Sequence, residues 1–118
     1  TESGDYTPDC FTENSVCYTG THDNETLLQW SERLPKECVE FTRKYLKLRK
    51  NDDICNAIIK AGMACASDLF IAQMQDYLMI GEKGRMNHPS TLSPNNWVWR
   101  MKPGADSEEL AARLHRMI

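Results

Sequence analysis

A short apolar stretch near the start of the chain ends abruptly in a polar cluster. Residues 15–19 predict a strand, Gly20 supplies a turn, and His22, Asp23 and Asn24 follow at once. A helix-like segment comes next. Polar side chains at the C-terminal end of a strand that leads into a helix are typical of the catalytic edge of a parallel α/β barrel. Because this strand comes so early, most strands of such a barrel would lie outside these residues.

A second apolar run, residues 69–74, is too short and too apolar for a surface helix. It predicts a strand that is buried on both faces, as in a parallel sheet, with Gln75 and Asp76 at its C-terminal end. The other predicted elements are a loop at 1–14, helices at 24–33, 35–49, 53–66 and 106–117, a helical turn at 77–80, and a long irregular segment at 81–104.

Residues suited to helix termini support these boundaries. Asp23 or Asn24 is placed to cap the first helix, and Pro35 suits the first turn of the second. Residues 51–53 provide a break and a fresh cap for the third helix, and the last helix begins at Asp106 and Ser107.

The order of strand, helices, strand, loop and helix matches the last two βα units of a parallel barrel. A parallel pair of strands cannot by itself cover both of its faces or pair its outer edges. We therefore predict an α/β fold that is a C-terminal fragment of a (β/α)8 TIM barrel, mostly helical with two short parallel strands. Residues 1–118 show no internal domain boundary, and a first residue of Thr rather than Met agrees with a fragment.

Composition excludes several classes of protein. A formal net charge of −3 gives no reason to expect a nucleic-acid partner, and the longest apolar runs are far too short to cross a membrane. The five cysteines are odd in number and form no C-x-x-C pair, which favours reduced thiols in a cytoplasmic protein over a disulfide framework. The scattered Cys and His residues predict no metal site.

Three motifs resemble one enzyme family. They are Tyr-Thr-Gly-Thr-His-Asp-Asn at 18–24, Met-Gln-Asp-Tyr-Leu at 74–78, and Gly-Arg-Met-Asn-His-Pro-Ser-Thr-Leu at 84–92, which runs into Asn-Trp-Val-Trp-Arg-Met at 96–101. The chain is thereby identified as similar to the 4-α-glucanotransferases called amylomaltases or disproportionating enzymes, glycoside hydrolase family 77 of the α-amylase clan. The resemblance implies a (β/α)8 barrel and a retaining mechanism.

The resemblance also implies residue roles. Asp23 matches a carboxylate that stabilises the oxocarbenium-like transition state, and His22 would donate to a hydroxyl of the same sugar ring. The implied substrate-binding residues are Asn24, Gln75, Asp76, Arg85, Asn87 and Trp97. The family's nucleophilic Asp and acid/base Glu lie on earlier strands, and the residues before Ser15 are too few to hold them. Only the stabilising corner of the site is therefore expected here.

Plainer explanations exist for the polar motifs. Asp23 and Asn24 could simply cap the following helix, and Gln75 and Asp76 could cap the turn that follows the second strand. Both explanations stand beside the functional ones, because the motif residues alone do not separate a cap from a sugar-binding group.

The residues of the long segment have similar alternatives. Arg85 and Asn87 could be solvated loop residues. The alternation of Trp97, Val98 and Trp99 suggests a strand-like strip, whose aromatic rings could anchor the loop by burial or form a platform for a sugar ring.

The function that the resemblance implies is transfer of α-1,4-glucan segments between maltodextrins by double displacement, with no metal or organic cofactor. The alternatives are a retaining α-glucan hydrolase of the same clan and an autonomous helical interaction module. The isolated chain is expected to be inactive and to self-associate. It departs from the family at Pro8-Asp9-Cys10, often Pro-His-Asn, and at Gln73, often Pro.

Overall fold

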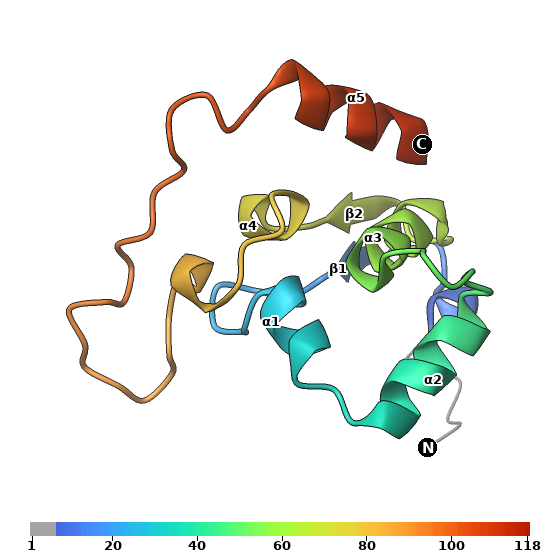
Figure 1. Ribbon diagram of the computed structural model, residues 1–118, viewed down its shortest axis with the longest axis horizontal. Helices are drawn as coiled ribbons and strands as arrows, with labels where there is room; N and C mark the ends of the chain where they lie inside the picture. Colours follow the sequence, from blue (N-terminus) through green and yellow to red (C-terminus); the bar gives the residue numbers. More distant parts are fainter. Residues whose placement is uncertain (1–6) are drawn as a thin grey trace.

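A parallel pair of short strands lies at the centre of the molecule. The computed structural model describes residues 7–118, and Figure 1 shows strand β1 (Val16–Tyr18) beside strand β2 (Leu69–Ile71). Cys17 is paired with Phe70 in the parallel register. The predicted two short parallel strands are confirmed.

Helices make up most of the regular structure, as predicted. In residues 7–118 the α-helices are α1 (Leu27–Glu32), α2 (Lys36–Tyr45), α3 (Ile54–Ala64), α4 (Met74–Tyr77) and α5 (Glu108–Met117), and two short 3-10 helices, η2 and η3, span Pro8–Cys10 and Glu82–Gly84. The first three α-helices form the connection between the two strands, and the long segment between η3 and α5 runs along one side of the molecule (Figure 1).

Helix α2 ends earlier than the sequence predicts. The prediction extended it to residue 49, but the helix stops at Tyr45 and Lys47 has a φ of 55°. The guanidinium of Arg43 donates to the carbonyls of Lys50 and Asp52, at 3.2 and 3.0 Å, which turns the following residues back across the helix end. This local hydrogen bonding outweighs the helix preference of the Lys and Arg residues there.

The second strand is shorter and more exposed than predicted. It ends at Ile71, and α4 begins at Met74, before the helical turn that the sequence suggested at 77–80. Leu69 and Ile71 are 53% and 41% exposed, so the burial on both faces that the sequence predicts for a complete sheet is not present within residues 7–118. In residues 7–118, β1 and β2 pair only with each other, which leaves the outward-facing side chains uncovered.

A small core lies between α1, α3 and β2. Leu27 of α1 and Cys55 and Ile59 of α3 are buried together, and Phe70 of β2 packs against them. Gly62 of α3 lies so close to the Phe70 ring that a methyl group on it would approach ring atoms to 2.7 and 2.9 Å. The bare glycine therefore sets how closely helix and strand pack.

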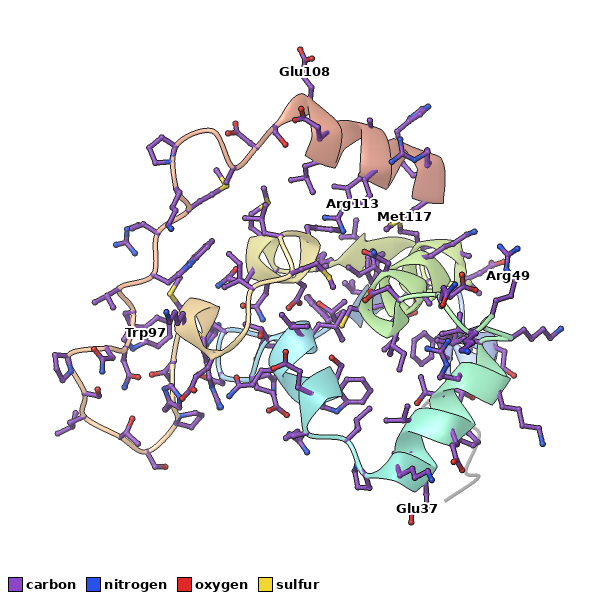
Figure 2. The ribbon with its side chains drawn as sticks, viewed as in Figure 1. Glu37, Arg49, Trp97, Glu108, Arg113 and Met117 are labelled. Atoms are coloured by element: carbon purple, nitrogen blue, oxygen red, sulfur yellow. The ribbon has the colours of Figure 1, made fainter. Side chains whose placement is uncertain are left out.

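Helix α5 packs on the outside of this core. Figure 2 shows Arg113 and Met117 on the side of α5 that faces α3 and α4. Met117 packs against the core cluster, and Arg113 donates to Oδ1 of Asn56 at 2.8 Å. Ser107 caps the helix by accepting from the amide of Leu110 at 3.1 Å, as the sequence predicts.

The described residues contain no disulfide, no metal-binding cluster and no membrane-spanning helix. All five cysteines are free, and burial, followed by the neighbouring thiol of Cys65, raises the pKa of Cys17 to about 11. Residues 7–118 contain no cluster of His, Cys, Asp or Glu arranged to hold a metal ion. Of the helices in that range, none combines the length and apolarity that a membrane crossing requires.

Candidate active site

The turn between β1 and α1 holds Asp23 outside the helix. The helix cap is Thr26, whose hydroxyl oxygen accepts from the amide of Gln29 at 3.3 Å, so the prediction of a cap at Asp23 or Asn24 is wrong. Asn24 instead closes the turn, since its side-chain oxygen accepts from the amide of Thr21 at 2.7 Å. The carboxylate of Asp23 is therefore not occupied by capping.

Residues of the long segment meet Asp23. Its Oδ1 accepts from Nδ2 of Asn87 at 2.8 Å and lies 3.4 Å from Nε2 of His22. Arg85 joins the same cluster, because its guanidinium donates to the carbonyls of both Asp23 and Asn87 at 3.0 Å. The side chain of Asp23 is nevertheless 47% exposed, so it remains open to a further hydrogen-bond partner.

Trp97 lies against His22 in an unusual backbone conformation. The two ring centroids are 5.1 Å apart and the planes are tilted by 45°. The φ of Trp97 is 63°, and its amide donates to the carbonyl of Met86 at 2.6 Å. With 54% of its surface exposed, the residue is neither a buried anchor nor part of a strand. Positive φ in an aromatic residue costs free energy, which makes this position a candidate for function. Figure 2 shows Trp97 on the long segment.

Gln75 and Asp76 face the interior of the chain. Both are buried within α4, with exposures of 5% and 2%. The amide of Gln75 donates to the carbonyl of Gly84 at 2.9 Å, and the carboxylate of Asp76 accepts from Thr19 and Leu27. Neither residue caps α4. Their predicted contact with a substrate stays a prediction.

An open cavity of about 650 Å3 adjoins the cluster, within the range of small-molecule sites. Glu25, paired with Arg33, carries a charge on this wall, because the hydrogen bond from Arg33 lowers the pKa of the glutamate. The cavity is lined by Tyr18, Thr19, Asp23, Asn24, Glu25, Leu27, Trp30, Arg33, Ile58 and Arg85.

Sequence reasoning missed two residues that shape this site. Thr19 donates to Asp76, and the side-chain amide of Gln73 donates to the carbonyl of Thr21 at 2.9 Å. The one available signal was that Gln73 stands where the resembling family often has Pro. The arrangement as a whole brings together a half-exposed carboxylate that lines the cavity, the imidazole beside it and the indole against that imidazole. These groups are suited to binding hydroxyl groups and an apolar ring face.

Comparison with known proteins gives a consistent result. A family model described as 4-alpha-glucanotransferase matches residues 1–106. The chain is 37% identical over 116 residues to a 4-alpha-glucanotransferase of Clostridium butyricum, covering 98% of this chain and 24% of that protein. It is 37% identical to the enzyme of the same name from Thermus thermophilus, covering 86% of this chain and 21% of that protein.

A solved structure resembles the fold. An amylomaltase from Streptococcus agalactiae in complex with acarbose superposes with a TM-score of 0.90 at 33% identity, over 99% of this chain and 23% of that one. The chain belongs to the 4-alpha-glucanotransferase family. It spans about a quarter or less of the length of these relatives.

Proposed function

We propose that these residues are the C-terminal part of a 4-α-glucanotransferase whose catalytic domain is a (β/α)8 barrel. The family match and the likeness to an amylomaltase support this, together with the two parallel strands whose outer edges are unpaired within residues 7–118. Residues 1–118 form one piece of that barrel with no internal boundary. The protein works in the cytoplasm on maltodextrins and needs neither a metal nor an organic cofactor.

The reaction is transfer of an α-1,4-glucan segment with retention. A nucleophilic carboxylate elsewhere in the protein takes up the glucanyl group while an acid/base carboxyl protonates the oxygen of the departing glucan. The same acid/base group then takes the proton from the 4-hydroxyl of a second glucan, which receives the glucanyl group and frees the nucleophile. The observation that carries the proposal is the half-exposed carboxylate of Asp23, held by Asn87 and His22 beside an open cavity. A negative charge fixed there stabilises the positive charge that develops on the sugar ring.

The remaining residues of the cluster bind sugar. His22 donates to a hydroxyl of the ring at the bond being cleaved, and Trp97 offers its exposed ring face beside it. Asn24 and Arg85 share the cavity wall with Asp23. Asn87 connects the carboxylate of Asp23 to the long segment through its hydrogen bond. This segment helps to exclude water from the site, so transfer is favoured over hydrolysis.

Product analysis tests the proposal. The full-length protein is incubated with maltotriose, and the products are separated by chain length. Transfer gives glucose together with maltodextrins longer than the substrate. Products that are only shorter than maltotriose would show that the protein is an α-glucan hydrolase instead. No change in the maltotriose would leave an interaction module as the better explanation.

The isolated 118-residue chain is expected to lack transfer activity and to self-associate. The nucleophile and the acid/base have no matching segment in it. Val16, Leu69 and Ile71 are exposed on a sheet whose two outer edges are unpaired within residues 7–118. Large apolar surfaces of this kind are uncommon on monomers. Light scattering and binding of a hydrophobic dye measure the effect. A monomer at high concentration, with no dye signal and a sharp melting transition, would contradict it.

A further inference from the structure

One buried carboxylate holds both ends of the turn that carries His22 and Asp23. Oδ2 of Asp76 accepts from the hydroxyl of Thr19 at 2.6 Å, and Oδ1 accepts from the amide of Leu27 at 2.8 Å. Thr19 directly follows β1, and Leu27 is the first residue of α1. Asp76 is only 2% exposed, so water does not compete for these bonds.

The same part of the chain also holds the middle of the turn. Three successive carbonyls accept donors from residues 73–87: that of Thr21 from Gln73 at 2.9 Å, that of His22 from the amide of Asn87 at 3.1 Å, and that of Asp23 from Arg85 at 3.0 Å. The backbone that carries Asp23 is thus fixed at its ends and along its length by the unit that follows β2.

We propose that Asp76 is a positioning residue, whose carboxylate sets the place of Asp23 by bonding Thr19 and Leu27, and that it does not itself touch the glucan. This inference rests on the proposed function and adds to it a residue that acts through another. Both carboxylate oxygens of Asp76 are engaged by the chain's own donors, and its burial keeps it from a ligand in the cavity that Asp23 lines.

The expected consequence of losing this carboxylate is a misplaced Asp23. In Asp76→Ala the amide of Leu27 and the hydroxyl of Thr19 lose their partner, and the turn relaxes. Displacement of a catalytic group by about 1 Å lowers the rate by up to about 100-fold, so kcat should fall by about 10- to 100-fold while KM changes little. Asp76→Asn should recover most of the loss, because its amide oxygen still accepts from Leu27 and its nitrogen can donate to Thr19.

A double-mutant cycle in the full-length protein tests the coupling. If Asp76 acts through Asp23, then Asp76→Ala added to Asp23→Asn lowers kcat by no more than about threefold beyond Asp23→Asn alone. The near-isosteric Thr19→Val removes one of the two bonds and should show a smaller, equally non-additive loss, which keeps the test open if Asp76→Ala does not fold. Asp53→Ala is the matched control, since Asp53 bonds the amide of Asn56 at the start of α3, far along the chain from the turn. It should lower stability and leave kcat unchanged.

The outcomes separate the two proposals. A wild-type protein that performs no transfer overturns the proposed function and this inference with it. Transfer by the wild type, combined with multiplicative losses in the cycle, or with Asp76→Asn as damaging as Asp76→Ala, overturns the positioning role alone and favours direct contact between Asp76 and the sugar. Unchanged kcat in Asp76→Ala overturns it as well.

Discussion

Replacing Asp23 by Asn in the full-length protein is expected to lower kcat by about 100-fold or more while KM changes far less. The amide is nearly isosteric with the carboxylate, so the hydrogen bond from Asn87 can be replaced by one of similar geometry, and the fold is kept. What is lost is the negative charge that, under the proposed function, faces the developing oxocarbenium ion. Since that charge matters most in the transition state, its removal appears in kcat.

Initial rates of maltotriose disproportionation, measured over a range of concentrations, separate the two constants. Asp106→Asn serves as the matched control, because it makes the same chemical change at an exposed carboxylate beside α5. A variant that melts several degrees lower with its kcat intact would mean that Asp23 has only a structural role.

Adding a methyl group at Gly62 is expected to destabilise the protein. In Gly62→Ala the new carbon would approach Cδ2 and Cζ of Phe70 to 2.7 and 2.9 Å, so α3 must move away from β2 or the ring must leave its place in the core. Such overpacking costs about 1–3 kcal/mol. The better helix propensity of Ala returns at most about 1 kcal/mol, and the clash with the ring of Phe70, which packs against the core, outweighs this gain.

Chemical denaturation of the full-length protein measures the effect. Gly81→Ala is the control, because a methyl group there would meet Leu28 at an ordinary contact distance of 3.9 Å. Phe70→Leu in the Gly62→Ala background should restore part of the loss by making room. A Gly62→Ala protein as stable as the wild type would show that the helix and strand are not packed as closely as described.

The element order followed from the sequence because each element carries a local signal. The apolar runs at 15–19 and 69–74 and the caps at Asp53 and Ser107 mark strands and helices without any knowledge of distant contacts. The early end of α2 could not be predicted this way, since it depends on Arg43 reaching carbonyls several residues further along the chain. The exposure of β2 depends on which neighbours are present, which no local pattern encodes.

The candidate site also has parts that the sequence predicts and parts that depend on long-range contacts. The motif that carries His22 and Asp23 marks the turn, but the contact between Asp23 and Asn87 spans 64 residues and exists only in the folded chain. The hydrogen bonds of Asp76 to Thr19 and Leu27 could not be predicted either. A carboxylate that follows a strand looks the same in sequence whether it faces a ligand or the interior of the protein. The resemblance to a family therefore indicated which residues belong to the site. The structure indicates which hydrogen bonds they make with one another.

Transfer to a labelled acceptor is the direct test that this protein moves glucan segments and that Asp23 is needed for the reaction. The full-length protein and its Asp23→Asn variant are given unlabelled maltotriose with 13C-labelled glucose, and the label is followed by mass spectrometry. We expect the wild type to move the label into maltose and longer maltodextrins, and the variant to do so at a rate that is lower by about 100-fold or more. Label that stays in free glucose while maltotriose is consumed, or equal incorporation by the two proteins, would contradict it.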